Sequence, residues 1–473
     1  LEAPHLTLGI FTETQELAAM AVLYDGRGSE EDLSQGLVNH KVSVSANFKL
    51  VLVRKEFRGR GFQKLLMGML EKYAVSRGFT HLCTTVSPKN EHSKSNIQAM
   101  GYEYDHTQEK YGGVVRDVFV KNIAEEAAEY NRDAMVSELK KGLECMDFIS
   151  LREQYKEFVY KGFSYEVAEG TYQVTFSYEI PGLSAFETVW KFPDAGKPVD
   201  ETIFDRLLFE LGMAEAISYW KVTCAPVLRV ACGSLTEWQN KWWRKLFYNG
   251  LGEFMYVNSI VVSEEELLNI VCEQEACAGK LIDTASYSGC LVPVGGGKDS
   301  VVSMEVLRNE DVTIYRINKD ATVENVLTAA GREFKTCFVN RRLDPRILEM
   351  NKRGFLNGHI PFSAVVAFST FISAYLKDIR YIALSNESSA NESTVVGSFV
   401  NHQYSKSYEF EQDFMEYIES FLDTEIRYFS LLRPLSELQI AYLFAKYTKY
   451  HKAFRSCNAG SKQGIWCCHC PKC

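Results

Sequence analysis

A run of three glycines constrains the fold of this chain more than any other feature. Gly295-Gly296-Gly297 is followed by Lys298-Asp299-Ser300, and these six residues separate the apolar run 291–294 from the stretch 301–307. The apolar run predicts a short buried strand, and the stretch after the loop predicts a helix. Consecutive glycines weaken any regular element, but they expose backbone N–H groups that can bind an anion. The pattern therefore predicts a strand, an anion-binding loop and a helix.

The segment around this loop predicts a parallel sheet. Strand-like apolar runs recur at 290–294, 313–317 and 379–384, and helical stretches separate them. Such alternation is typical of α/β folds with helical crossovers, in which ligands bind at the carboxyl ends of the strands. Two long polar strings, 384–392 and 400–411, follow apolar runs. We therefore expect both strings to contribute to a ligand site.

The length of the chain predicts several domains, because 473 residues exceed one ordinary core. We expect an α/β protein that begins with a mixed-sheet domain at 1–122, truncated at its N-terminus, and a helical linker at 123–144. A central α+β domain at 145–280 and a parallel-sheet domain at 281–473 follow. Because the chain starts without Met and ends inside a cysteine cluster, we expect both ends to be cuts.

Composition and charge narrow the classes of function. The chain has 46% hydrophobic and 24% charged residues, which is typical of a globular protein. Its net charge of -9 gives no reason to expect a nucleic-acid partner or an anionic membrane surface. No apolar run reaches about 18 residues, and no signal peptide is recognisable. We therefore expect a cytoplasmic protein with no membrane span.

A second glycine-rich turn lies near the N-terminus. Arg58-Gly59-Arg60-Gly61-Phe62-Gln63 follows the strand-like run 48–53 and opens a helical stretch. Backbone N–H groups at a helix N-terminus suit a pyrophosphate, although a tight turn without a ligand also favours glycine. Together with 84–90 and 96–102, this turn resembles the GCN5-related N-acetyltransferase (GNAT) family over about residues 5–120.

The resemblance to GNAT enzymes implies acetyl-CoA as a cofactor. Its pyrophosphate would be held by Arg58, Gly59, Arg60, Gly61 and Gln63. Two positions depart from the family pattern. Gln63 stands where a small residue is usual, and Ile97 stands where many members have a tyrosine that acts as the general acid. The acid that protonates the leaving thiolate and the amine that accepts the acetyl group therefore stay unassigned.

The loop 295–300 differs from a Walker A motif, because Asp299 rather than Ser or Thr follows Lys298, and the apolar run before the loop has no glycine at the place of the first Walker glycine. It resembles the Ser-Gly-Gly-x-Asp-Ser loop of the PP-loop ATP pyrophosphatases, with Gly295 at the first serine. That resemblance implies cleavage of ATP to AMP and pyrophosphate. It implies phosphate contacts from Gly295, Gly296, Gly297 and Ser300, an acidic role for Asp299 beside Mg²⁺, and charge stabilisation by Lys298.

Five of the thirteen cysteines crowd into the last seventeen residues. Cys457, Cys467, Cys470 and Cys473 have a spacing that places four thiolates around one tetrahedral ion. We expect structural Zn²⁺, with an iron–sulfur cluster as the alternative metal and reduced surface cysteines as the alternative without metal. Cys468 is spare. The layout is similar to the zinc site of the PP-loop enzyme 7-cyano-7-deazaguanine synthase.

Five strings, at 217–221, 250–254, 384–392, 400–411 and 465–473, together resemble the UDP-N-acetylmuramoyl-L-alanyl-L-glutamate epimerase family over about residues 150–473. That resemblance implies a bacterial isomerase of peptidoglycan precursor synthesis, fused here to an acetyltransferase domain. Its substrate would be a UDP-activated muramoyl dipeptide, whose terminal L-Glu becomes D-Glu while ATP is split to AMP and pyrophosphate. The alternatives are a PP-loop ligase that amidates or thiolates, or a protein whose N-terminal domain supplies the main activity or senses acetyl-CoA.

The polar strings supply the remaining candidates. His402 is expected to be the epimerisation base, because its pKa suits neutral pH, and a structural histidine is the alternative. The side chains expected to hold the substrate or Mg²⁺ are Asn386, Glu387, Asn391, Glu392, Lys406 and Glu409. Trp220, Trp242 and Trp243 are expected in an aromatic core rather than stacked on a sugar or base.

Overall fold

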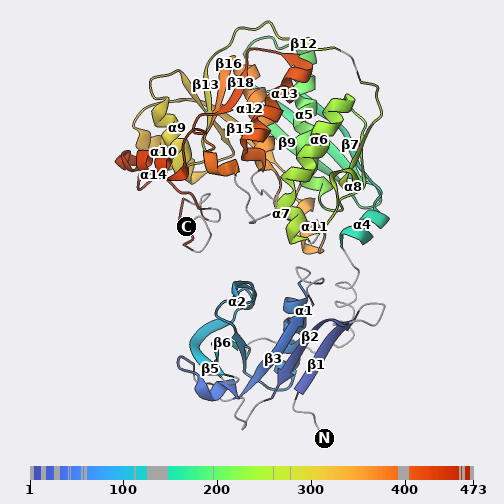
Figure 1. The fold of residues 1–473 in the computed structure, drawn as a ribbon, viewed down its shortest axis with the longest axis vertical. Helices are drawn as coiled ribbons and strands as arrows, with labels where there is room; N and C mark the ends of the chain where they lie inside the picture. Colours follow the sequence, from blue (N-terminus) through green and yellow to red (C-terminus); the bar gives the residue numbers. More distant parts are fainter. Residues whose placement is uncertain are drawn as a thin grey trace. The chain divides into compact units, whose positions relative to one another are not determined.

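The computed structural model describes residues 5–11, 17–25, 32–40, 42, 44–54, 57, 61–110, 113–124, 147–194, 196–258, 260–276, 279–391, 404–457, 460 and 464–468. The chain divides into two compact units, residues 1–145 and 146–473, called here the N-terminal unit and the C-terminal unit. Both combine helices with sheets, so the expected α/β class is confirmed (Figure 1). The boundary expected at residue 280 falls inside the C-terminal unit.

The N-terminal unit is a six-stranded sheet in the order β1-β2-β3-β4-β6-β5. Its strands are β1 (His5–Phe11), β2 (Leu17–Tyr24), β3 (Ser45–Val53), β4 (His81–Val86), β5 (Glu103–Lys110) and β6 (Val114–Asn122). Helix α1 (Phe62–Ser76) packs on the sheet, whose core includes Leu66, Leu70 and Phe48. A short helix, α2 (Glu91–Gln98), and a 3-10 turn, η1 (Leu33–Gly36), complete the unit.

Strands β3 and β4 form the one parallel pair among the described strands of this unit, and they pair over only part of their length. Ser45–Phe48 is hydrogen-bonded to His81–Thr84, and the mutual pairing stops there. The strands continue to Val53 and Val86. The sheet therefore opens between β3 and β4 on the side where β3 leads toward α1.

The C-terminal unit contains a ten-stranded sheet in the order β11-β10-β7-β8-β9-β15-β14-β13-β16-β18. Its first strands are β7 (Glu157–Ala168), β8 (Thr171–Ile180), β9 (Ser184–Pro193), β10 (Val227–Val230) and β11 (Asn269–Cys272). The others are β13 (Ser288–Pro293), β14 (Val312–Ile317), β15 (Lys335–Arg342), β16 (Ile379–Leu384) and β18 (Arg427–Ser430), and they run parallel to one another as expected. A separate pair joins β12 (Leu281–Ile282) to β17 (Leu422–Asp423).

Helices cover both faces of the parallel strands. One face carries α9 (Lys298–Val306), α10 (Ala321–Ala330) and α14 (Glu437–Ala445), which lie together in Figure 1. The other packs against α5 (Glu201–Trp220), α6 (Glu237–Gly250), α12 (Phe362–Lys377) and α13 (Tyr408–Phe421). Adjacent residues of β13 point into the two cores, Leu291 into one and Val292 into the other. The layers therefore position the strand ends between two packed cores.

The remaining helices of the C-terminal unit are short. They are α4 (Phe148–Gln154), α7 (Gly252–Val257), α8 (Glu264–Leu267) and α11 (Arg346–Lys352). Trp220 and Trp243 are 0% exposed and Trp242 is 6% exposed, inside the larger core. The prediction that these rings are packing residues is confirmed. They are therefore not available to stack on a ligand in this arrangement.

Candidate active site

The glycine loop connects β13 to α9 at the carboxyl edge of the parallel strands. Gly297 is the N-cap of α9 and provides no side-chain capping hydrogen bond. Gly296 has a φ of +79°, and a Cβ atom there would lie 2.5 Å from Cγ2 of Thr322. Only glycine fits that position without a shift of the backbone or of α10. The loop therefore offers uncapped N–H groups to an anion.

Lys298 and Asp299 form an ion pair in the first turn of α9. The Lys298 ammonium lies 2.6 Å from Oδ1 of Asp299 and 3.4 Å from Oε1 of Glu437 in α14. Burial opposes the charge on Lys298, but the hydrogen bond and charge of Asp299 outweigh it and raise the lysine pKa. Lys298 is therefore cationic at neutral pH and stands beside the N-terminus of α9. Glu437 is a neighbour that the sequence did not single out.

A chain of hydrogen bonds joins the glycine-loop helix to the first polar string. Oγ of Ser303 in α9 lies 2.7 Å from Oγ of Ser385, just after β16. The next residue, Asn386, donates its side-chain amide to Oγ of Ser430 at the end of β18. Since β16 lies next to β13 in the sheet, Asn386 and the glycine loop share one edge. Glu387 is close enough to Lys298 to support its charge.

The second polar string reaches the same region through Arg433, which follows β18. Its guanidinium donates to the carbonyl oxygens of Glu387 (2.9 Å) and Lys406 (2.8 Å). It also forms an ion pair with Glu411 at 3.1 Å, and both side chains are largely buried. Arg433 therefore ties the two strings together. Sequence reasoning did not identify Arg433, and its position after a strand was the one sequence feature that could have indicated a place near the site.

Of the other predicted substrate residues, three lie within the described part of the chain and one lies outside it. Lys406 belongs to a 3-10 turn, η4 (Tyr404–Lys406), and Asn391 ends another, η3 (Ser388–Asn391). Glu409 forms an ion pair with Lys245 of α6 at 2.7 Å and is 60% exposed. That contact gives Glu409 a structural partner. His402 and Glu392 lie outside the described residues.

The cysteine segment packs against the glycine loop. The backbone N–H of Arg455 donates to the carbonyl oxygen of Gly296 at 3.0 Å. Two residues later, the buried Cys457 sulfur accepts backbone hydrogen bonds from Gly460 (3.1 Å) and Cys467 (3.3 Å). Within the described part of the chain, no group of three potential metal ligands is found. Cys470 and Cys473 lie outside that part.

The predicted acetyl-CoA turn is described only in part, because Arg58, Gly59 and Arg60 lie outside the described residues. Gly61 is the N-cap of α1 with a φ of 74°, again without a side-chain cap. Gln63 is held by α2, since it donates to Ser93 at 3.2 Å and accepts from Asn96 at 3.0 Å. The turn thus presents uncapped N–H groups at α1.

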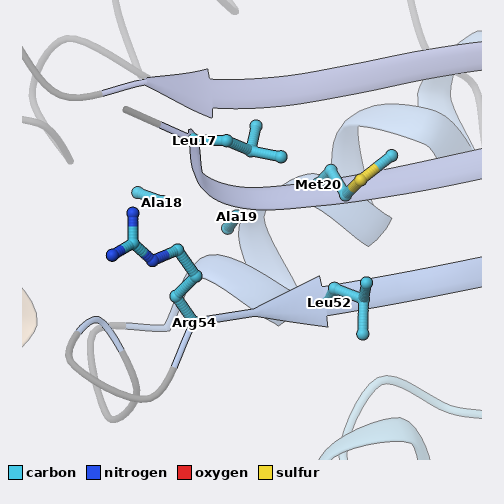
Figure 2. Close-up of a pocket in the computed structure, with 6 residues that line it drawn as sticks. All are labelled: Leu17, Ala18, Ala19, Met20, Leu52 and Arg54. Carbon is cyan, nitrogen blue, oxygen red and sulfur yellow. The ribbon is translucent and has the colours of Figure 1, made fainter. Parts of the chain in front are cut away.

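Two further features of the N-terminal unit are relevant to ligand binding and catalysis. Ile97 stands where the resemblance to GNAT enzymes would place the general-acid tyrosine. It is 1% exposed and belongs to the core. A hollow of about 330 Å³ lies where β2 begins and β3 ends (Figure 2). Its lining residues are Leu17, Ala18, Ala19, Met20, Leu52 and Arg54. That lining is apolar apart from Arg54, so it offers no group for proton transfer.

Comparisons with known proteins assign the C-terminal unit to a family. Residues 150–431, more than half of the chain, match the family model described as the MurL N-terminal domain. This chain belongs to the MurL family. Among the described residues, no helix is both long enough and apolar enough to cross a membrane.

The curated relatives of this MurL-family chain share one name. The UDP-N-acetyl-alpha-D-muramoyl-L-alanyl-L-glutamate epimerase of Xanthomonas oryzae pv. oryzae is 33% identical over 282 residues, 58% of this chain and 61% of the relative. The chain therefore spans less than two thirds of that relative's length. The epimerases of Salinispora tropica and of a Micromonospora species are each 32% identical over 334 residues, 67% of this chain. The matches cover 71% and 72% of those relatives.

Solved structures show a weaker likeness. The ribosomal-protein-S18-alanine N-acetyltransferase from Escherichia coli matches with a TM-score of 0.21 and 14% identity, over 27% of this chain and 74% of that chain. The PaiA N-acetyltransferase from Thermoplasma acidophilum, solved with coenzyme A, gives a TM-score of 0.19 and 16% identity. It covers 25% of this chain and 61% of that chain. The N-terminal unit is therefore interpreted from its own strand pairing.

Proposed function

We propose that the C-terminal unit is an ATP-dependent epimerase, which converts the terminal L-Glu of UDP-MurNAc-L-Ala-L-Glu to D-Glu. One observation carries the proposal: an uncapped glycine loop with Lys298 and Asp299 stands at the ligand-binding edge of a MurL-family sheet. The curated relatives that bear this activity in their names support the choice of substrate.

The chemistry explains why an epimerase would use ATP. Removal of the α-hydrogen beside a free carboxylate would create a dianion. If a carboxylate oxygen first attacks the α-phosphorus of ATP, pyrophosphate leaves and the carboxylate becomes an acyl adenylate, in which the acyl group itself carries no charge. A base can then take the α-proton, a proton is returned to the opposite face, and water releases AMP. The charge that opposes carbanion formation is thereby removed.

The described residues have distinct roles in this scheme. The N–H groups of Gly296 and Gly297 and the hydroxyl of Ser300 would bind the β- and γ-phosphates. Lys298 would neutralise charge as pyrophosphate leaves, and Asp299 would supply a carboxylate oxygen to Mg²⁺, a ligand that this cation favours. Asn386 and Glu387, beside the loop, would orient the glutamyl group. His402 stays the predicted base.

The deciding experiment incubates the protein with ATP, Mg²⁺ and the L-Glu precursor in D₂O. We expect D-Glu on chiral analysis, deuterium at the α-carbon, and AMP. Replacing Asp299 by Asn should abolish AMP formation and leave the melting temperature nearly unchanged, because this side chain is partly exposed. Unchanged L-Glu would refute the proposed function. AMP formation that requires ammonia or a sulfur donor would instead identify a ligase.

We also propose that the N-terminal unit binds acetyl-CoA. Gly61 leaves the N-terminus of α1 without a side-chain cap, and the opening between β3 and β4 leads to that turn. Both features suit a pyrophosphate and its attached chain. Calorimetric titration with acetyl-CoA should show binding, and an assay with amines separates a transferase from a sensing module. Absence of binding would contradict both roles.

A structural Zn²⁺ held by Cys457, Cys467, Cys470 and Cys473 is proposed for the end of the chain. The two backbone N–H groups directed at the Cys457 sulfur support it, because such bonds stabilise a thiolate. Elemental analysis of the purified protein should find zinc. Visible absorption together with bound iron would identify an iron–sulfur cluster instead.

A further inference from the structure

Lys221 is a buried cation with no carboxylate partner in the part of the chain that the structure describes. It caps the C-terminus of α5 and is 8% exposed. Its ammonium donates to Oδ1 of Asn357 at 3.0 Å and to the carbonyl oxygen of Gly358 at 2.7 Å. Both acceptors are neutral, and no ion pair to Lys221 exists among the described residues. Burial lowers the pKa of Lys221 to about 8.

Three largely buried arginines of the C-terminal unit are neutralised by carboxylates. Arg341 lies 2.6 Å from Glu215, and Arg206 lies 2.6 Å from Glu210. Arg433 is paired with Glu411. Burial of a charge is unfavourable unless it is paired and hydrogen-bonded. Lys221 is buried more completely than these arginines and lacks such a pair among the described residues. Ligand sites are where such uncompensated groups gather.

Lys221 lies at the same sheet edge as the glycine loop. Arg341, near the end of β15, contacts Glu215 and Ser218 in the last turns of α5, so this helix ends at that edge. Lys221 follows Ser218 by three residues, about one helical turn. The segment 356–361 precedes α12, which leads back to the start of β16. Its residues Asn357 and Gly358 therefore also lie at the carboxyl edge of the strands.

The position is reachable by a ligand. Asn357 is exposed, while the lysine behind it is buried. An ammonium has three donors, and two are used by Asn357 and Gly358. The third can serve an anion that enters over the 357–358 loop. Tyr219, two residues before Lys221, shares a hydrogen bond with Thr188 of β9. Because β14 and β15 separate β9 from β13 in the sheet, this subsite is spaced along the edge from the glycine loop, as an extended substrate would need.

We propose that Lys221, held by Asn357 and Gly358, binds an anionic group of the muramoyl dipeptide substrate other than the carboxylate that is adenylated. The inference rests on the proposed function. Two groups of that substrate share the required chemistry: the γ-carboxylate of the terminal glutamate and the diphosphate of UDP. A bound anion would provide the counter-charge that the described residues do not supply, and it would keep Lys221 protonated.

The test compares the wild-type protein with Lys221→Met and with the control Lys377→Met. Lys377 also donates to a backbone carbonyl, that of Asp194, but it lies at the opposite edge, just before β16. Dissociation constants are measured for three probes: the full L-Glu precursor, an analogue that ends in L-Gln, and UDP-MurNAc without the dipeptide. We expect Lys221→Met to weaken binding of the full precursor by about 10- to 100-fold, the range of a charge-assisted hydrogen bond.

The two shorter probes identify the anion. If Lys221 binds the γ-carboxylate, the L-Gln analogue will bind equally to the wild type and to Lys221→Met. If it binds the diphosphate, UDP-MurNAc will lose the same affinity as the full precursor. Unchanged affinity of Lys221→Met for all three probes, with an epimerase-active wild type, would overturn the inference alone. A wild type that leaves L-Glu unchanged would overturn the proposed function and this subsite with it.

The melting temperatures of the Lys221 variants distinguish a ligand-binding role of this lysine from a structural role. Methionine has nearly the shape of lysine without the buried charge, so the ligand-free Lys221→Met protein should melt at the same temperature as the wild type or higher. Lys221→Arg keeps the charge and should retain part of the affinity. A clear drop in the melting temperature of Lys221→Met, with affinity restored once the protein is folded at lower temperature, would show that Lys221 only anchors the 357–358 loop.

Discussion

Gly296 shows how one residue can decide whether the glycine loop forms. Its φ of +79° and the clash that any Cβ atom would make with Thr322 exclude every other residue from an unstrained fit. Its carbonyl oxygen also accepts the N–H of Arg455. The residue therefore combines a backbone requirement with a tertiary contact.

Replacement of Gly296 by Ala should disturb both. We expect a loss of about 1–3 kcal/mol in the free energy of unfolding, from left-handed strain and from the clash with Thr322. ATP should bind at least about tenfold more weakly, because the N–H groups of the loop shift. Gly295→Ala is the matched control, since a Cβ there meets nothing within 4 Å, and its stability should be unchanged. Equal melting temperatures for both variants would contradict the steric argument.

Some site residues could be predicted from the sequence and others could not, for a physical reason. Lys298 and Asp299 belong to a local motif whose geometry is set by neighbouring residues. Arg433 and Lys221 act through contacts with residues far away in the chain, such as the 136-residue separation between Lys221 and Asn357. No local pattern encodes such a pairing. The Glu409 contact with Lys245 was missed for the same reason.

At the scale of elements, the end of β18 organises the polar strings. Arg433 joins the segment after β16 to the segment before α13 with hydrogen bonds to Glu387 and Lys406. Its replacement by Ala would leave the buried Glu411 carboxylate without its partner. The parallel strands and their helical crossovers followed from the alternation in the sequence, but the strand order and this cross-link did not.

We expect Arg433→Ala to lower the free energy of unfolding by about 3 kcal/mol, the scale for breaking a buried ion pair. Turnover should fall further than stability alone explains, because the segments of Glu387 and Lys406 lose their common support. Arg427→Ala, at the other end of β18, is the control, since the described bonds of the Arg427 side chain go to carbonyl oxygens of its own turn. Chemical denaturation and steady-state kinetics measure the two effects. A fully active Arg433→Ala enzyme would argue against a positioning role.

The cysteine segment is a second element that contacts the ligand site. It contacts the glycine loop through Arg455, two residues before Cys457. If a metal orders this segment, its removal by a chelator, or the change Cys457→Ser, should weaken ATP binding as well as release zinc. Titration with ATP before and after chelation, followed by zinc addition, measures the coupling. Loss of zinc with unchanged ATP affinity would separate the two sites.

At the scale of the whole molecule, the two units have separate hydrophobic cores. Among the described residues, the core around α1 is formed by the N-terminal unit, and the two large cores around the ten-stranded sheet are formed by the C-terminal unit. The sequence predicted both regions because each has its own pattern of strands and helices. It placed a further boundary at residue 280, which lies inside one compact unit of the structure.

Separate cores predict that residues 147–473 fold without the N-terminal unit. This fragment should melt cooperatively and keep the proposed epimerase activity, since the glycine loop, both polar strings and Lys221 lie within it. Differential scanning calorimetry and the chiral assay test this. An unfolded fragment would show that the N-terminal unit contributes to stability, and a folded but inactive one would show that it contributes to the reaction.

The antiparallel pairing of β9 with β15 has a consequence for how the protein is made. Lys191 pairs with Asn340, about 150 residues later in the chain, so the edge of β9 is uncovered while that stretch is synthesised. At about 5–20 residues per second, the interval is on the order of ten seconds. An exposed strand edge can pair with other chains during that time. Slower initiation, lower temperature or added chaperone should therefore raise the yield of native protein more than any change near the ligand site.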